Sequence, residues 1–400
     1  MISMFLRIYD IIKFLISKSD YKYIKQADII ISTNDTDKSY IYKNKLYSPI
    51  ADSFVEYLKK YNNSYIAISL PGSKFNKKQT LLNYLNINRE YYISKIKNFF
   101  SNEDELILFW KKIFKKVNPK IIICIQPPPE MCVAAKKCNI KIFDIQHGLF
   151  NNLIYYNLQN SYGEKGLPNI IFCWDKISTN YLKKILPNVS SCILGNPWIA
   201  YLDKKNTNKF INLEIKKVRK VPKKQPVIII TLQWKRNYTK QIIDIPEHII
   251  KCLKRLVNEG WNCWLRFHPA HLKEFSKDIL QNEWNKKTNL KINSINIYDL
   301  SDSALPYLLR FANAHITNFS ASIIEAKIMK VPSYIWCKDK NIKANLFQPY
   351  LNTLNIYEVP PNINKFVKLI NKHKVKKKTI SDHLTESKKK YFLFRKKYLQ

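Results

Sequence analysis

The first half of the chain alternates short apolar runs with amphipathic segments. The apolar runs have the length of buried β-strands, and most of them end in a polar or Pro/Gly turn. The clearest amphipathic segment, residues 102–117, begins with acidic residues and ends with Lys residues, as the helix dipole favours. We predict strands at 27–32, 65–70, 120–125, 140–144, 170–174 and 192–194, with helices that include 50–61, 130–138 and 177–186. Strands that alternate with helices predict a parallel sheet.

A Lys/Asn-rich stretch of low apolar content, residues 203–225, interrupts this pattern, which then starts again. The second half predicts strands at 226–232, 261–267, 314–317 and 332–336, and helices at 246–258, 304–312 and 323–330. We therefore predict an α/β protein of two Rossmann-like domains. The predicted parts are an N-terminal domain at 1–202, a linker at 203–225, a C-terminal domain at 226–365 and a basic helical end at 366–400.

Length and composition agree with two buried cores, because 400 residues exceed one ordinary core and 46% of them are hydrophobic. The charge is extreme: 68 basic minus 30 acidic residues gives +38. Drift in an AT-rich genome would produce this, and so would selection for a polyanionic partner. Only eight of the basic residues are Arg, and no nucleic-acid-binding module is recognisable, so we expect no nucleic-acid partner. An anionic membrane surface is the better-supported partner.

The segment 1–17 is amphipathic, since Arg7, Asp10 and Lys13 interrupt its apolar residues and no cleavage site follows. No stretch of the sequence has the roughly 18 apolar residues of a transmembrane helix. The eight cysteines lack CxxC spacing, which favours reduced thiols. We expect a cytoplasmic protein, peripheral on the inner face of the membrane, with 1–17 and the basic end at 374–397 as contact zones.

The first group of candidate chemical residues follows a predicted strand: Asp144, His147 and Gly148, in the sequence Asp-Ile-Gln-His-Gly. A His that leaves the carboxyl end of a strand can act as a general base at neutral pH. Asp144 could be the base itself or could orient the imidazole, and a His that only stabilises a loop is the alternative. Two further candidates for the same region are Asp175 and Asn196, which also follow predicted strands.

The second group, Arg266, His268 and Pro269, leaves a strand of the second domain, where a His and backbone groups could reach a phosphate. A surface ion pair of Arg266 is the alternative. In the third group, Ser320 and Ser322 open a helix that contains Glu325. Free N–H groups and small hydroxyls at a helix start can bind phosphate, and Glu325 could bind ribose hydroxyls. An ordinary capping box would give the same pattern.

The order of these motifs resembles bacterial surface-polysaccharide transferases of GT-B fold. Gln-His-Gly, Trp-Asp, Gly-Asn-Pro, Arg-x-His-Pro and Ser-x-Ser-x-x-Glu-Ala follow one another between residues 119 and 336. The chain is similar to the families with HP and Ser/Ser motifs, which include sialyl- and Kdo-type transferases, and more distantly to CDP-glycerol glycerophosphotransferases. The resemblance implies donor contacts at His268, Ser320, Ser322 and Glu325, a base at His147 or Asp144, and a C-terminal helix that packs back on the first domain.

The sequence departs from sialyltransferases of this kind, which carry two acidic residues before the Gly where this chain has Gln146 and His147. A CMP-linked donor therefore stays one option among several. The resulting prediction is an inverting glycosyltransferase that moves a sugar from a nucleotide-sugar donor to a glycan or lipid-linked acceptor of the bacterial surface, in capsule or lipopolysaccharide. We expect no metal and no cofactor. The alternatives are a CDP-polyol phosphotransferase of teichoic-acid type, a nucleotide-sugar epimerase and a non-catalytic polyanion-binding protein.

Overall fold

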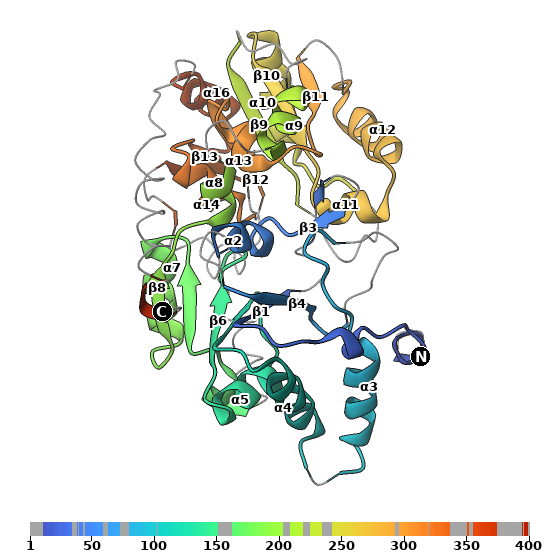
Figure 1. Cartoon of the computed structure of the whole chain (residues 1–400). Helices are drawn as coiled ribbons and strands as arrows, with labels where there is room; N and C mark the ends of the chain where they lie inside the picture. Colours follow the sequence, from blue (N-terminus) through green and yellow to red (C-terminus); the bar gives the residue numbers. More distant parts are fainter. Residues whose placement is uncertain are drawn as a thin grey trace. The chain divides into compact units, whose positions relative to one another are not determined.

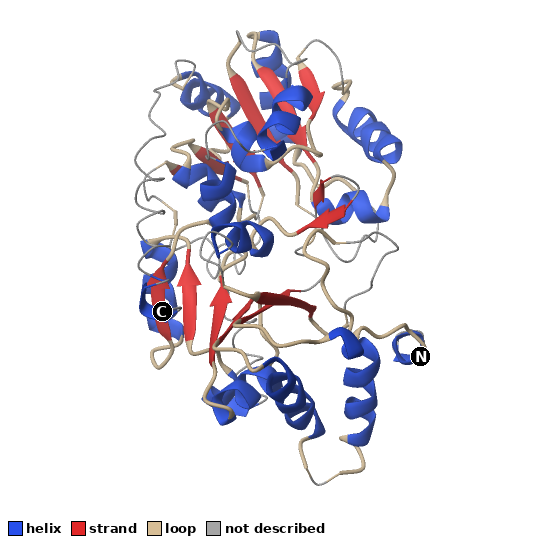
Figure 2. Cartoon of the chain, viewed as in Figure 1, coloured by secondary structure: helices blue, strands red, loops and turns tan. Residues whose placement is uncertain are grey.

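In the computed structural model, the chain forms two α/β units, each built on a six-stranded sheet (Figures 1 and 2). The first unit contains Met1–Tyr201 and Ser387–Gln400, and the second contains Leu202–Glu386. The structure describes residues 11–33, 38, 40–42, 45–58, 63–72, 80–101, 103–150, 162–202, 209–218, 225–233, 242–292, 296–318, 320–336, 350–351, 355–373, 394 and 396–398.

The sheet of the first unit has the order β4-β1-β5-β6-β7-β8, and all its strands are parallel. Its strands are the predicted apolar runs, which are buried because helices cover both faces of a parallel sheet. They are β1 (Ile29–Thr33), β4 (Tyr65–Ser69), β5 (Ile121–Cys124), β6 (Lys141–Ile145), β7 (Ile170–Cys173) and β8 (Ser190–Ile193). A small antiparallel hairpin, β2 (Tyr40–Tyr42) and β3 (Lys45–Tyr47), was not predicted.

The helices of the first unit are fixed at their ends by local chemistry. Asp104 precedes α4, and its carboxylate accepts a hydrogen bond from the N–H of Ile107; Asn118, in the left-handed region, ends that helix. The buried face of α4 carries Trp110 against one face of the sheet. The helices are α2 (Ala51–Leu58), α3 (Asn88–Lys97), α4 (Glu105–Val117), α5 (Pro129–Lys137), α7 (Lys176–Ile185) and α8 (Pro197–Leu202), with short 3-10 turns at Tyr21–Tyr23 and Gly163–Gly166.

The sheet of the second unit has the order β11-β10-β9-β12-β13-β14 and is also parallel throughout. Its strands are β9 (Val227–Thr231), β10 (Asn262–Arg266), β11 (Ile297–Asp299), β12 (Ala314–Thr317), β13 (Ser333–Ile335) and β14 (Ile356–Glu358). Its helices are α9 (Lys209–Val218), α10 (Glu247–Asn258), α11 (Pro269–Glu274), α12 (Lys277–Thr288), α13 (Leu305–Leu309), α14 (Ser322–Ile328) and α16 (Ile363–Asn371). Trp261 and Trp284 are fully buried in its core.

The predicted α/β class, with two Rossmann-like sheets, is confirmed. The segment treated above as a linker, 203–225, contains helix α9, which belongs to the second unit. The basic end, 366–400, is divided: α16 belongs to the second unit, whereas Phe394 packs in the first unit against the rings of Phe54, Phe143 and Phe172. Most of the proposed membrane zone at 374–397 lies outside the described residues. Within the described part, no helix has the length and apolar character needed to cross a membrane.

Candidate functional site

The strand order of the second sheet marks where a ligand would bind. Numbered along the chain, its strands lie in the order 3-2-1-4-5-6, which is the Rossmann order. The direction of winding reverses between β9 and β12, and open α/β sheets bind ligands beyond the carboxyl ends of the strands at such a switch point. Thr231 ends β9 and Thr317 ends β12, so these residues mark the edge where the crevice is expected.

A buried network of hydroxyls and one imidazole lies at this edge. The hydroxyl of Thr317 donates to the carbonyl oxygen of Thr231 (3.0 Å), so it must accept from the hydroxyl of Thr231 (2.8 Å). The proton of Thr231 is thereby used, and Nε2 of His315, 2.9 Å from the same oxygen, must therefore donate to it. Nδ1 of His315 then accepts from the hydroxyl of Ser333 (2.9 Å). Ser322, with its Oγ 3.1 Å from Oγ1 of Thr231, is left with a proton that it can give to Thr231 or to a ligand.

The electrostatics of His315 agree with this assignment. The side chain is fully buried, and burial lowers the pKa of its imidazole to about 3 because the charged form would lose its hydration. A neutral ring has one donor and one acceptor nitrogen, which is the pair that the network uses. His315 therefore connects β12, β9, β13 and the start of α14 without carrying charge.

Arg266 and Glu325 bring side chains of opposite charge to the same edge. Arg266 is the last residue of β10 and is buried, and Glu325 lies one turn into α14 and is partly buried. Burial raises the pKa of the Glu325 carboxyl group to about 7, although the positive charge of Arg266 acts in the opposite direction. A carboxyl group that titrates near neutral pH at the edge of a Rossmann sheet is typical of a functional site.

The loop after β11 holds the Arg266 segment in place. Nε of Arg266 faces the carbonyl oxygen of Ser303 at 3.4 Å, and the N–H of Phe267 donates to the hydroxyl of Ser301 (2.9 Å). The buried carboxylate of Glu214, on α9, accepts from the N–H of Ala304 (2.8 Å). A helix from the predicted linker thus fixes the loop that positions Arg266.

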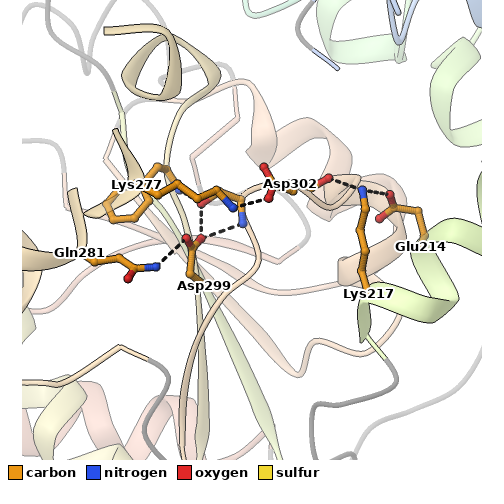
Figure 3. Close-up of polar contacts among 8 residues, drawn as sticks. Glu214, Lys217, Lys277, Gln281, Asp299 and Asp302 are labelled. Carbon is orange, nitrogen blue, oxygen red and sulfur yellow. Dashed lines mark hydrogen bonds and ion pairs between the residues drawn. The ribbon is translucent and has the colours of Figure 1, made fainter. Parts of the chain in front are cut away.

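Figure 3 shows the polar contacts around this loop. Lys217 on α9 donates to Glu214 (2.8 Å) and to the carbonyl oxygen of Asp302 (2.6 Å). From α12, Lys277 forms an ion pair with Asp302, and Gln281 donates to Asp299 at 3.4 Å. Helices α9 and α12, both in the second unit, therefore hold the loop after β11 in place.

The other residues predicted to contact the donor are close in sequence to Arg266 or to Glu325. His268 is partly exposed, and its carbonyl oxygen accepts from the N–H of His271 (2.9 Å). Pro269 is the first residue of α11. The hydroxyl of Ser320 accepts from the N–H of Ser322 (3.2 Å). The N-cap residue of α14 is Ala321, which makes no side-chain capping bond. Glu325 does not close a capping box.

In the first unit, β6 ends in Asp144 and Ile145, and His147 follows in the loop. The buried carboxylate of Asp144 accepts from the N–H of Gln126 (2.9 Å), a residue with φ of 53°. This contact ties β6 to the loop after β5. The imidazole of His147 is partly exposed and, among the described residues, has no hydrogen-bond partner, so no contact with Asp144 orients it.

Gln146 was not predicted, and it is the residue that shapes this loop. Its buried amide nitrogen donates to the carbonyl oxygen of Gly148 (2.8 Å) and to the hydroxyl of Ser178 (3.0 Å). Its amide oxygen accepts from the N–H of Trp174 (2.7 Å). With its neighbour fixed in this way, His147 is held at the carboxyl edge of the sheet.

Two candidates of the first unit begin helices. Asp175 precedes α7, and its carboxylate accepts from the N–H of Ser178 (2.8 Å). The amide oxygen of Asn196 accepts from the N–H of Trp198 (2.9 Å) at the start of α8. Before it, Gly195 has φ of 89°, which explains a Gly at that turn. Both polar side chains therefore have a structural role at the edge where they were predicted to face a ligand.

Residues missed in the sequence share one property: they have partners on other elements. Thr231, His315 and Ser333 lie on three neighbouring strands, and Gln146 contacts Trp174, which follows β7, and Ser178 on α7. Apart from a polar residue inside an apolar run, no local signal reveals them. Among the described residues, no group of His, Cys, Asp and Glu side chains could hold a metal ion.

The two sheets define the class of fold, the GT-B type, in agreement with the comparison of solved structures. A variant of the wall teichoic acid polymerase TagF aligns over 95% of this chain and 86% of its own, with a TM-score of 0.53 and 13% identity. The UDP-GlcNAc 2-epimerase of Methanocaldococcus jannaschii aligns over 93% of this chain and 99% of its own, with a TM-score of 0.55 and 15% identity. Another UDP-N-acetylglucosamine 2-epimerase gives a TM-score of 0.51 at 12% identity, over 92% of this chain and 91% of its own. Neither a protein-family model nor a curated protein sequence matches the chain.

Proposed function

We propose that the protein is an inverting, metal-independent glycosyltransferase that moves a sugar from a nucleotide-activated donor to an acceptor of a bacterial surface glycan. In this proposal the second unit binds the donor and the first unit activates the acceptor. The observation that carries it is the edge of the second sheet, where Arg266, Glu325 and Ser322 meet the β9/β12 switch point.

The chemistry of that edge fits a nucleoside phosphate. The Arg266 guanidinium is a donor suited to phosphate oxygens, and the Ser322 hydroxyl has a proton available for the same purpose. Glu325 could accept hydrogen bonds from ribose hydroxyls in its ionised form. His268 and Ser320 would complete the contacts, as the motif resemblance implies.

His147 supports the acceptor side of the proposal. In a single displacement, the acceptor oxygen forms a bond to the anomeric carbon, and the bond from that carbon to the donor phosphate breaks with inversion. The acceptor proton passes to His147, and the nucleotide leaves with the bonding electrons, stabilised by cationic and N–H groups. An imidazole without a partner among the described residues is available for this proton.

A phosphotransferase that uses a CDP-polyol donor is the second candidate. It is supported by the fold likeness to TagF, which is named as a wall teichoic acid polymerase. The same base and the same phosphate contacts would serve both reactions. A nucleotide-sugar epimerase, by the likeness to the 2-epimerases, is the third. The three differ in their products.

The experiment is a thermal-shift screen with CMP, CDP, UMP, UDP, GDP and TDP, followed by product analysis with the donors of the responding base. A ligand that binds only the folded state raises the melting temperature by mass action. Release of free nucleotide from a nucleotide sugar supports the glycosyltransferase. A chain that responds to none of the six nucleotides would refute every nucleotide-dependent proposal and leave a polyanion-binding protein.

We also propose that the protein works peripherally on the cytoplasmic face of an anionic membrane, where a lipid-linked acceptor would be found. The support is the charge of +38. Because exposed charges are screened within about 8–10 Å near physiological ionic strength, purely electrostatic binding should fall steeply with salt.

A further inference from the structure

The turn between α3 and α4 carries strongly exposed apolar side chains. Phe99 and Phe100 are 78% and 88% exposed, and Phe100 is the most exposed large hydrophobic residue in the described part of the structure. Ile93 and Ile96, one helical turn apart on α3, are each 38% exposed and continue towards the two rings. We call these four residues the turn patch.

The orientation of α3 makes this exposure unusual. A surface helix normally directs its isoleucines to the core and its polar residues to solvent. On α3 the inward side chains include the buried Asn88 and Tyr91, which packs on Phe109 and donates to the carboxylate of Glu130 (2.8 Å), whereas Ile93 and Ile96 are exposed. The neighbouring helix α4 has the ordinary arrangement and buries its apolar residues.

Backbone hydrogen bonds extend the end of α3 through Phe99 and Phe100. The N–H of Phe99 donates to the carbonyl oxygen of Ile96 (3.1 Å), and the N–H of Phe100 donates to that of Lys97 (2.9 Å). The chain then enters α4, which packs beside α3 (Figure 1). The rings therefore sit at the end of a two-helix projection rather than on a flat face.

We propose that the turn patch is a membrane-contact element, whose two Phe rings enter the interfacial region of an anionic lipid bilayer. The area argues against a second copy of the chain. With about 200 Å² for a fully exposed Phe, the two rings present roughly 330 Å². A stable protein–protein interface needs about 800 Å² from each partner. Two aromatic side chains at the end of a projection are enough for an interfacial lipid contact, as aromatic rings favour that zone.

The charges around the patch are of both signs. Exposed Lys residues follow both helices: Lys95 and Lys97 on α3, Lys112 and Lys115 on α4. The carboxylates nearby are partly engaged, since Glu90 accepts from Ser19 and Asp104 caps α4; Glu103 and Glu105 also lie in this region. Local charge is thus mixed, and the rings carry the contact while the overall excess of Lys brings the protein to the surface.

The N-terminal segment is attached to the first half of α3, away from the two Phe rings. Residues 11–15 are helical, and Phe14 stacks on Tyr92 of α3 with ring centroids 4.8 Å apart. Ile12 and Ile16 are 52% and 80% exposed beside this contact. The described part of the predicted zone 1–17 is therefore attached to the helix that carries the turn patch.

The test is vesicle flotation with the full chain, using phosphatidylcholine vesicles with and without phosphatidylglycerol, at low and at high salt. The double substitution Phe99→Ser/Phe100→Ser should lower the partition coefficient on anionic vesicles at least about tenfold, from the apolar area removed. What binding remains should disappear at high salt, whereas wild type should keep a salt-resistant fraction. The control Ile279→Ser removes an exposed apolar side chain (47%) from the second unit and should bind like wild type.

The inference is overturned if the double variant binds as wild type at both salt concentrations, or if wild type ignores anionic vesicles. It is also overturned if sedimentation shows a wild-type dimer that the double variant abolishes, since the patch would then bind a second copy. The membrane contact rests on the proposed function only for its biological role. Nucleotide-induced thermal shifts, measured without vesicles, should be equal in wild type, the double variant and the Ile279→Ser control. Absence of these shifts in wild type would refute the proposed function and leave the membrane contact untouched.

Discussion

The carboxyl group of Glu325 should make the stability of the protein depend on pH in a way that one substitution removes. Burial raises its pKa to about 7 in the folded chain, from 4.5 for an ordinary Glu. Between these values the folded state binds more protons at this site than the unfolded state. The contribution to stability is therefore fully present below pH 4.5 and is lost as pH rises through 7.

The magnitude follows from the two pKa values. One pKa unit corresponds to about 1.4 kcal/mol, and integration from pH 5 to pH 8 gives a loss of about 2.5 kcal/mol from this group. The buried His315 acts in the opposite direction, because its pKa is lowered to about 3 and its contribution is lost as pH falls below 6.5. The pH profile of wild type alone thus mixes two effects of opposite sign.

The difference between wild type and Glu325→Gln isolates the carboxyl group, since His315 is present in both proteins. Urea unfolding at pH 5, 6, 7 and 8 should show the variant gaining about 2.5 kcal/mol on wild type across the series. Arg266→Gln should steepen the wild-type profile, because Arg266 lowers the pKa of Glu325. Parallel curves for wild type and Glu325→Gln would show that the carboxyl group does not titrate in this range and that the reasoning is wrong.

Three further predictions concern the two sheet edges. His147→Ala should reduce turnover by about 100- to 10,000-fold while nucleotide-induced thermal shifts persist, as expected for loss of a general base; near-normal turnover would exclude this role. His268→Ala should weaken nucleotide affinity by about 1.5–3 kcal/mol in calorimetric titration, by loss of a hydrogen bond to a charged phosphate, and unchanged affinity would contradict the donor assignment. Gln146→Leu should lower stability in urea unfolding by about 2–4 kcal/mol, because the N–H of Trp174 and the hydroxyl of Ser178 lose their partner; an equally stable variant would show that the loop does not need these bonds.

The sequence was informative where a structural element is written in consecutive residues. Runs such as 227–231 and 121–124 are apolar on both faces of a parallel sheet, so their strands could be predicted from the pattern alone. The strands β2, β3, β11 and β14 have only three residues each, and runs this short carry little periodic signal. α9 was missed because Lys and Asn residues dominate the stretch 203–225 that contains it, although five of its ten residues are apolar and Glu214 on it is fully buried.

The sequence indicated which residues of the candidate site lie at the ends of strands. It did not indicate which of these residues contact one another. Arg266 and Glu325 are separated by two strands in sequence, β11 and β12, and the strand order β10-β9-β12 brings their edges together. In the same way, Asp144 was read as a possible base, and the contact with Gln126 that engages it depends on the pairing of β5 with β6. Periodicity cannot supply such neighbours, because it describes one element at a time.

The position of Phe394 has a consequence for the order of folding during synthesis. This ring closes an aromatic cluster with Phe54, Phe143 and Phe172, yet the whole second unit is translated between Tyr201 and Ser387. Domains usually fold as they leave the ribosome, the N-terminal one first. Here the unit that is translated first cannot complete its core until Phe394 has emerged, so the second unit can finish folding earlier, as an insertion held at both ends by an incomplete host.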